Sequence, residues 1–233
     1  MSVSEPEADS PAPPAVRPRT AERRAERSRE IVAATRALFD ERGVREAQIE
    51  DIARAVGINR AIIYRHFSSK EELFAVTLLG YLTELDAALA PGDDPDLGAA
   101  ERLELLVRAF FGYGLEHPAF VDCAQTLLRR RGTELMEEVS EDVMIRLGTG
   151  MSACLGHVVG VLEDGTRTGD FAVADPHLLA NVLYTQGLGA LNLAHLQLSV
   201  RRHISGLPVV DPVGTDDLLA HLLRGALAMA RGA

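Results

Sequence analysis

The chain has 233 residues, a formal net charge of −10, 47% hydrophobic residues and only 5% aromatic residues, with no tryptophan. This length can bury one moderate hydrophobic core, or a small core and a larger one. Cys123 and Cys154 are too few for a disulfide framework, so we expect a reducing, cytoplasmic environment. The N-terminal stretch begins acidic and has no apolar segment, so we expect neither a signal peptide nor a membrane location.

The charge is unevenly distributed along the chain. Residues 17–75 contain thirteen basic and ten acidic residues, whereas residues 76–233 contain eleven basic and twenty-one acidic residues. A DNA-binding protein needs positive charge only where phosphates approach, so the acidic total does not exclude a nucleic-acid partner. Lys70 is the one lysine among the twenty-four basic residues.

The first predicted elements are a tail and a long helix. Residues 1–19 are rich in Pro, Ala and acidic residues, which predicts a disordered tail. Thr20 can cap a helix that runs to about Arg42. The beginning of this helix carries four arginines: Arg23, Arg24, Arg27 and Arg29. They can lie along DNA phosphates or can simply be solvated, and the sequence does not decide between these alternatives.

Residues 48–67 read as two short helices joined by a tight turn. Apolar residues recur at helical spacing in the first of them, at Ile49, Ile52, Ala53 and Val56. Gly57 can end this helix in the left-handed conformation, and the side chain of Asn59 can cap the next one. The spacing therefore predicts a helix-turn-helix.

The second of these helices has an unusual surface. Ile63 and Phe67, four residues apart, give it a buried stripe. Its other faces carry Arg60, Ile62, Tyr64, Arg65 and His66, and Lys70 follows just beyond. A short helix does not need such side chains for stability, whereas a helix in a DNA major groove needs donors for phosphates and base edges.

These residues resemble the TetR (tetracycline-repressor-like) family of transcriptional regulators. The positions that match its signature are Ile52, Ala53, Gly57, Ala61, Tyr64, His66, Phe67, Lys70, Glu71 and Leu73. The preceding segment also matches, at Ile31, Ala34, Leu38, Phe39 and Gly43, so the resemblance covers roughly residues 28–75. It implies an all-α protein with a three-helix DNA-binding domain (20–75) and a larger effector-binding and dimerisation domain (76–233).

The resemblance also implies roles for individual residues. Tyr64, His66 and Lys70 are expected to contact phosphates, although Tyr64 could instead be a core aromatic and His66 a plain surface residue. Four further residues are expected to face base edges or flanking phosphates: Asn59, Arg60, Ile62 and Arg65. Ile62 cannot donate a hydrogen bond, so it would contact a thymine methyl group.

The sequence departs from the family pattern at the start of the first motif helix. Ala47 and Gln48 stand where the family usually has Thr or Ser. Glutamine is a poorer cap, which predicts a helix start weakened by about 1 kcal/mol. Ile58 and Asn59 replace the commoner Val and Ser, and both keep the apolar turn residue and the polar cap.

Further helices are expected in the remainder of the chain. One starts near Ser69 and runs towards Ala90, where PGDDPD ends it, and Asp175-Pro176 opens the penultimate helix. No strand is expected, and residues 201–214 read as a loop. The other expected helices span about 97–116, 118–131, 133–164 (ended by EDGTRTGDF), and Thr215 or Asp216 to Gly232.

The penultimate helix indicates dimerisation. Leu178 to Val200 contains no formal charge, so a helix there must be buried on most sides. Its polar residues argue against a membrane span, and we expect one face to meet a second copy of the chain. The predicted interface residues are Gly187, Gly189, Ala190, Leu219, Leu222, Leu223 and Ala226. The alternative is a central helix of a monomer.

Polar or polarizable residues on apolar helices are candidates for an effector pocket, and each could instead belong to the core or the interface. They are Tyr113, Gln125, Met144, Met151, Cys154, His157, Asn181, Tyr184 and Gln186. Cys154 and His157 could reach one metal ion, but two ligands do not make a site, so no metal or cofactor is expected. The arginines at 129–131 could form a nucleic-acid patch or a solvated helix end.

Two other classes of protein are less consistent with the sequence. A helical enzyme would use His157 or His195 for acid–base work. The sequence offers no Ser/His/Asp order, Gly-rich phosphate loop or acidic-histidine metal motif for it. A ligand-independent DNA-binding protein would need basic charge over its whole body. We therefore expect a homodimeric, non-enzymatic regulator, most simply a repressor of a pseudo-palindromic operator, released by an unknown lipophilic effector.

Overall fold

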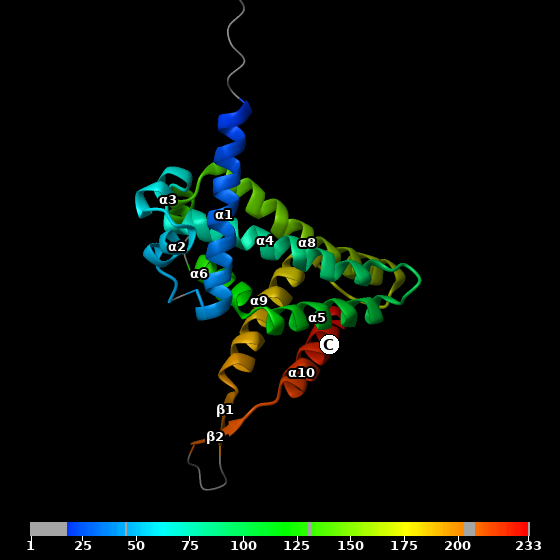
Figure 1. The fold of residues 1–233 in the computed structure, drawn as a ribbon. Coiled ribbons are helices and arrows are strands. Elements are labelled where there is room, and N and C mark those ends of the chain that lie inside the picture. Colours follow the sequence, from blue (N-terminus) through cyan, green and yellow to red (C-terminus); the bar gives the residue numbers. More distant parts are fainter. Residues whose placement is uncertain (1–17, 45, 130–131, 203–207, 233) are drawn as a thin grey trace, which may run out of the picture.

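The computed structural model describes residues 18–44, 46–129, 132–202 and 208–232. Figure 1 shows a small head, formed by α1 (Pro18–Arg42), α2 (Ile49–Val56) and α3 (Arg60–His66), beside a larger helical body. The predicted two-part helical architecture is confirmed. The body contains α4 (Lys70–Leu89), the short η1 (Ala90–Asp93), α5 (Ala99–Glu116), α6 (Pro118–Leu128), α7 (Gly132–Glu138), α8 (Glu141–Thr168), α9 (Pro176–Leu196) and α10 (Thr215–Arg231).

The head forms as the sequence predicts. Gly57 ends α2 with a φ of 71°, and the Asn59 side chain accepts a hydrogen bond of 3.1 Å from the Ile62 N–H. Gln48 makes no side-chain cap at the start of α2, as its poor capping chemistry predicts. The buried side chains of the head lie between its three helices: Ile31, Leu38, Phe39, Ile52, Ile63 and Phe67. The predicted tail falls outside the described residues except for Pro18 and Arg19, which begin α1.

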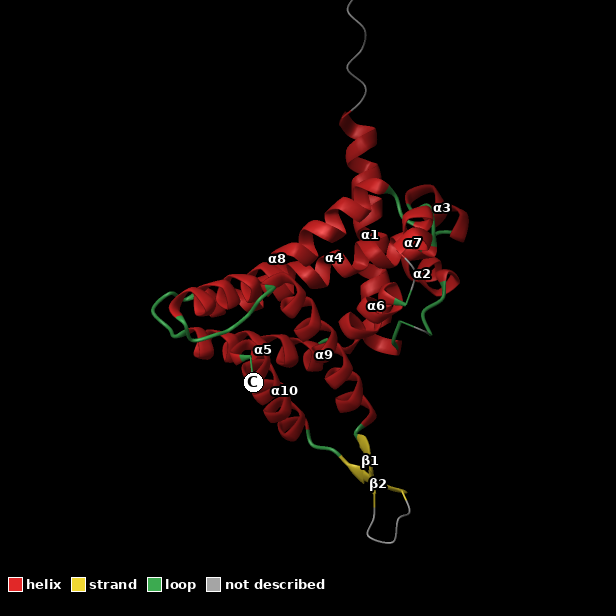
Figure 2. Cartoon of the chain, turned by 180° about the vertical axis from the view of Figure 1, so that it is seen from behind, coloured by secondary structure: helices red, strands yellow, loops and turns green. Residues whose placement is uncertain are grey.

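Helix α4 connects the head with the body. Ser69 caps it by accepting a hydrogen bond of 2.9 Å from the Glu72 N–H. Near its start Phe74 packs edge-on against Phe39 of α1, with ring centroids 4.8 Å apart. Further along, α4 lies side by side with α8, as both Figure 1 and Figure 2 show. Movements of the body can therefore reach the head through α4.

The predicted helix over 133–164 is wrong in two respects. It is divided into α7 and α8 at residues 139–140, and α8 continues through Thr168. The expected break at EDGTRTGDF comes late, because the helix continues through the first glycine of this segment, Gly165, and stops only at the second. The helix ends at Gly169, whose φ of 87° suits glycine. Phe171 then folds back over Gly165, where a side chain would collide with its ring.

The expectation that the chain has no strands is also wrong. Strands β1 (Leu198–Arg202) and β2 (Pro208–Pro212) pair antiparallel, with Val200 opposite Val210. Helix α9 ends at Leu196, and Gln197 has a φ of 54°, so the predicted helix to Val200 stops early. β-branched valines favour the extended pairing, but the strands are too short to show a clear alternation. Figure 2 shows the hairpin projecting from the body.

Two segments of the described chain are long and apolar enough to cross a membrane by length and composition alone. They are Lys70–Asp93 and Glu141–Thr168. Both pack against other helices of the body, and against each other. Core helices pass the same test of length and composition, so this finding is weak support for a membrane span.

Candidate functional site

The outer face of α3 is exposed to solvent. Tyr64 is 45% exposed and the Arg60 side chain is 67% exposed, while Ile63 on the opposite face is buried in the head. Arg65 is exposed, and Ile62 and His66 are half-buried. The buried Ile63 fixes the rotation of this short helix, so Arg60 and Tyr64, one helical turn apart, both point outward.

Arg60 is held by an acidic residue of the neighbouring helix. Its Nη1 lies 3.0 Å from Glu50 Oε1 of α2. Both side chains are largely exposed, and an exposed pair of this kind contributes little to stability. The pair therefore orients the guanidinium in the free protein and can open at small cost.

The end of α3 is fastened to the basic first part of α1. Arg24 Nη2 donates a hydrogen bond of 3.0 Å to the Arg65 carbonyl, and Ser28 Oγ lies 2.9 Å from His66 Nδ1. Burial, together with the positive charge of Arg24 and Arg65, lowers the pKa of His66. His66 is therefore neutral near pH 7, and its ring helps to hold α3 against α1.

Two further predicted DNA-contacting residues flank the exposed face. Lys70 is the first residue of α4, and its Nζ lies 5.1 Å from the centroid of the Phe74 ring. Asn59 uses its side-chain oxygen as the helix cap, which leaves its amide nitrogen for other contacts. All seven predicted residues thus lie on α3 or its two flanks. Asn59, Arg60, Tyr64 and Arg65 are exposed there, whereas His66 turns towards Ser28 of α1.

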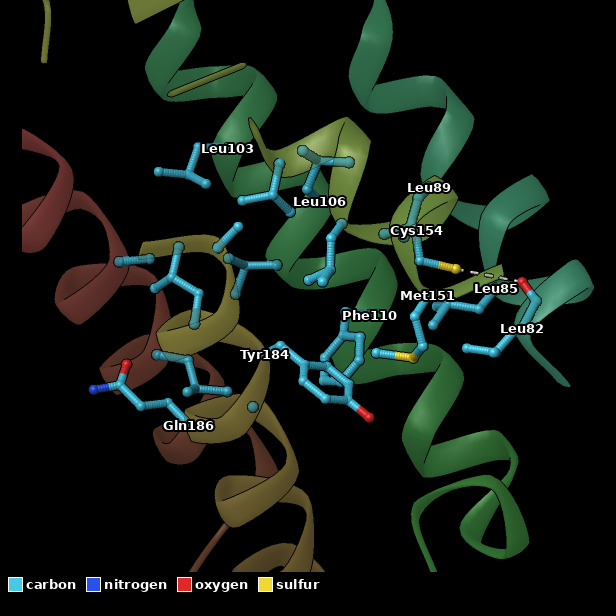
Figure 3. Close-up of a pocket in the computed structure, with 18 residues that line it drawn as sticks. Leu82, Leu85, Leu89, Leu103, Leu106, Phe110, Met151, Cys154, Tyr184 and Gln186 are labelled. Atoms are coloured by element: carbon cyan, nitrogen blue, oxygen red, sulfur yellow. Dashed lines mark hydrogen bonds between the residues drawn. The ribbon is translucent and has the colours of Figure 1, made fainter. Parts of the chain in front are cut away.

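An apolar cavity with a volume of about 60 Å³ lies inside the body, between α4, α5, α8, α9 and α10. Figure 3 shows Phe110, Met151 and Tyr184 close together at one side of it, with Cys154 above them. None of the residues lining it within the described chain carries a formal charge. They are Leu82, Leu85, Leu89, Leu103, Leu106, Val107, Phe110, Met151, Cys154, Leu155, Val158, Ala180, Leu183, Tyr184, Gln186, Gly187, Leu222 and Ala226.

Four of the nine residues proposed for an effector pocket line this cavity: Met151, Cys154, Tyr184 and Gln186. Burial raises the pKa of Cys154 to about 12, with a smaller contribution from Asp86, and the thiol donates to the Leu82 carbonyl at 3.4 Å. Burial also raises the pKa of Tyr184. Both groups are therefore neutral near pH 7, and the cavity wall is uncharged.

The other five proposed pocket residues lie elsewhere. The Tyr113 hydroxyl donates to the Tyr81 carbonyl, Gln125 to the Leu188 carbonyl and Asn181 to the His177 carbonyl. Met144 packs half-buried against the core. Each of them satisfies a polar group or fills the core, so polarity on an apolar helix is a poor guide to a cavity.

His157 is the fifth of these residues, and it faces two carboxylates. Its Nε2 lies 3.0 Å from Asp86 Oδ1 and its Nδ1 lies 2.7 Å from Asp93 Oδ2. Cys154, three residues earlier, turns instead towards the Leu82 carbonyl. No cluster of three or more potential metal ligands occurs among the described residues.

The predicted interface residues are divided between the inside and the outside of the chain. Gly187, Leu222 and Ala226 line the cavity, and Leu223 is buried. Gly189 is exposed, while Ala190 and Leu219 are half-buried.

Four exposed residues of α9 were not predicted from the sequence. They recur at helical spacing, together with the predicted Gly189, on one uncharged face of the helix: Leu178, Val182, Thr185 and Leu196. Their spacing of three, four or seven residues was a signal available in the sequence. The leucines of the cavity wall, by contrast, cannot be told from core leucines without the packing.

The fold and the exposed face of α3 define a helix-turn-helix protein with an attached helical domain. The family model for bacterial regulatory proteins of the tetR family matches residues 31–77, which include all of this motif. Residues 31–77 therefore form a DNA-binding domain of the TetR family.

A curated relative supports this assignment. The HTH-type transcriptional repressor KstR2 of Mycobacterium tuberculosis (strain CDC 1551 / Oshkosh) is 34% identical over 113 residues, which cover 48% of this chain and 56% of that protein. The chain thus spans about half the length of the curated relatives it matches.

Solved structures share the whole fold at low sequence identity. A tetR-family regulatory protein from Rhodococcus RHA1 has a TM-score of 0.62 at 20% identity, covering 87% of this chain and 96% of that one. FadR from Bacillus subtilis, in complex with stearoyl-CoA, has a TM-score of 0.59 at 16% identity, covering 88% and 98%. These similarities show that the body, as well as the head, has the fold of the family.

Proposed function

We propose that the protein is a cytoplasmic transcriptional regulator, acting as a repressor that binds a pseudo-palindromic operator as a homodimer and is released by a small-molecule effector. The observation that carries this proposal is the pairing of two features in one chain. An oriented Arg60 and an exposed Tyr64 lie on one face of the head, and an uncharged cavity lies in the body.

Dimerisation follows from the limits of one short helix. A helix of seven residues reaches too few base pairs to select a genomic site, whereas two heads related by a two-fold axis read two half-sites. The exposed, uncharged face of α9 supplies a surface for the second copy. Leu178 and Leu196 at its two ends are 62% and 66% exposed, an arrangement that burial against a partner would stabilise.

The cavity indicates the chemistry of the effector. With no charged residue in its wall, it favours an uncharged molecule, or the uncharged part of a larger one. FadR, which shares this fold, binds stearoyl-CoA, a molecule with a long apolar chain.

The cavity is smaller than the space of about 150 Å³ that holds benzene in a protein core. A larger ligand therefore enters only if α5, α8 and α9 move apart. Such a movement is what a released repressor requires, since it can change the separation of the two heads.

A combined binding assay tests the proposal. Genomic fragments retained by the protein are selected, and affinity for the best fragment is measured over a range of salt concentrations with and without uncharged lipophilic compounds. We expect a selected site with two half-sites, strong salt dependence, and a compound that raises the melting temperature and lowers DNA affinity. Sequence-specific binding that no such compound affects would favour the alternative, a ligand-independent DNA-binding protein.

A further inference from the structure

A buried carboxylate lies at the junction between the recognition helix and the body. Glu72, in the first turn of α4, is 7% exposed. Its Oε2 accepts hydrogen bonds from both the backbone N–H (2.5 Å) and the hydroxyl of Ser68, which follows α3 by two residues. Its Oε1 accepts a hydrogen bond of 2.5 Å from the hydroxyl of Ser140. One carboxylate therefore joins the end of the DNA-binding head to the start of α8.

A second contact parallels this one. The hydroxyl of Ser69, the cap of α4, donates to the carbonyl of Glu138, the last residue of α7. The turn between α3 and α4 is thus bound to the α7–α8 junction by two neighbouring serines. These contacts bridge residues about seventy positions apart in the chain, and they do not depend on local helix geometry.

The negative charge of Glu72 makes the junction sensitive to the loss of any one of its hydrogen bonds. Burial tends to raise the pKa of its carboxyl, but hydrogen bonds from Ser140 and Ser68 outweigh burial, and the pKa is lowered. The group is an anion in the folded protein, and its hydrogen-bond donors are serines rather than a cation. A buried anion that loses a donor is strongly destabilised, so the geometry of the junction is tightly defined.

The same junction is continuous with the cavity wall. Ser140 immediately precedes α8, and that helix supplies Met151, Cys154 and Leu155 to the cavity. The recognition helix is therefore connected to the cavity wall through one serine, one carboxylate and the turn at Ser68.

We propose that Glu72 and Ser140 are positioning residues for operator recognition: they fix the orientation of α3 relative to the body and so set the half-site spacing that a dimer accepts. The proposal rests on the proposed function as a dimeric DNA-binding regulator. Neither Glu72 nor Ser140 contacts DNA in this arrangement. A loosened junction would let each head rotate, and a dimer with mobile heads would tolerate operators whose half-sites are displaced.

The test measures affinity for duplexes in which the two selected half-sites are at the best spacing, or one base pair closer or farther apart. We expect the wild-type protein to prefer the best spacing by roughly tenfold, the scale of one hydrogen bond to a charged group. Ser140→Ala and Glu72→Gln should reduce this preference to about threefold or less. Penalties for base mismatches inside a half-site should stay unchanged.

Two control variants separate positioning from general stability. Ser140→Thr keeps the hydroxyl and should retain the wild-type spacing profile, and Ser152→Ala removes an exposed serine of α8 that is distant from the junction in sequence. If Ser140→Ala folds with a lowered melting temperature but keeps the wild-type spacing profile, the role is merely structural and the proposal is wrong. If the wild-type protein selects no DNA at all, the proposed function itself fails.

Discussion

Arg36 and Glu84 form a bidentate ion pair that joins the head to the body. Arg36 Nη1 lies 2.5 Å from Glu84 Oε1, and Nη2 lies 2.6 Å from Oε2. The guanidinium also stacks 4.3 Å from the centroid of the Tyr81 ring, whose hydroxyl donates to Asp40 at 2.7 Å. This pair fastens α1 to the middle of α4, whereas Glu72 fastens the other end of the head. The head is therefore held at two separate points.

Glu84→Gln should destabilise the protein by about 1 kcal/mol, because it removes the negative charge of a bidentate ion pair. The loss is not larger because the pair is partly exposed to solvent. Denaturant unfolding measures the change. Glu104→Gln is a matched control, since the Arg108–Glu104 pair is exposed and its closest atoms are 3.8 Å apart. Equal losses in the two variants would contradict the structural role of the Arg36–Glu84 pair.

The same pair predicts a pH dependence of stability. The hydrogen bond from Arg36 lowers the pKa of Glu84 below its ordinary value of 4.5. A carboxyl whose pKa is lower in the folded state stabilises the fold above its unfolded pKa, and this contribution is lost as the pH falls through the folded pKa. The stability difference between wild type and Glu84→Gln should therefore shrink as the pH falls below 4.5. A difference that stays constant there would argue against the ion pair.

The exposed face of α3 predicts two kinds of DNA-binding variant. Tyr64→Phe and Lys70→Ala should weaken binding to all sequences similarly, because both are expected to contact phosphates. Arg60→Ala should relax sequence preference by about 1–3 kcal/mol at one base position. Affinities for the selected operator and its single-base mismatches measure both effects. If Arg60→Ala leaves every mismatch penalty unchanged, the base-reading role of Arg60 is wrong.

Gly187 allows α9 to approach Phe110 of α5. A Cβ atom at this position would lie 2.6 Å from Phe110 Cε1, so Gly187→Ala should force the ring to shift. We expect a cost of about 1–3 kcal/mol from overpacking, partly offset by about 1 kcal/mol of helix propensity. Gly156→Ala, where a Cβ atom meets open space on α8, should only gain stability. Equal gains in melting temperature for both variants would contradict this packing.

The exposed face of α9 predicts the effect of a charge on assembly. Val182 is 36% exposed, so Val182→Glu should leave the melting temperature of the single chain nearly unchanged. It should weaken the proposed dimer, because the carboxylate would be desolvated between two copies. Light scattering over a range of concentrations measures the oligomeric state. A wild-type protein that is strictly monomeric at micromolar concentration would refute the interface.

The sequence predicts the head well because its signals are local. Gly57, Asn59 and the Ile63–Phe67 spacing each determine a cap or a buried stripe within a few residues, and the structure shows each of them. The cavity depends on how α5, α8, α9 and α10 pack, so Gln125 and Asn181 could not be separated from Tyr184 by polarity alone. The junction at Glu72 was missed for the same reason, since Ser140 lies 68 residues away from it.

Selection of bound genomic fragments, followed by footprinting of the best fragment, tests whether the protein reads an operator as a two-fold dimer. We expect protection of two half-sites related by a two-fold axis and about one helical turn of DNA apart, roughly 10 base pairs centre to centre or a multiple of this. The protection should disappear when Arg60 and Tyr64 are both replaced by alanine in a variant that remains folded. Enrichment of no fragment, or a footprint that survives this double replacement, would contradict it.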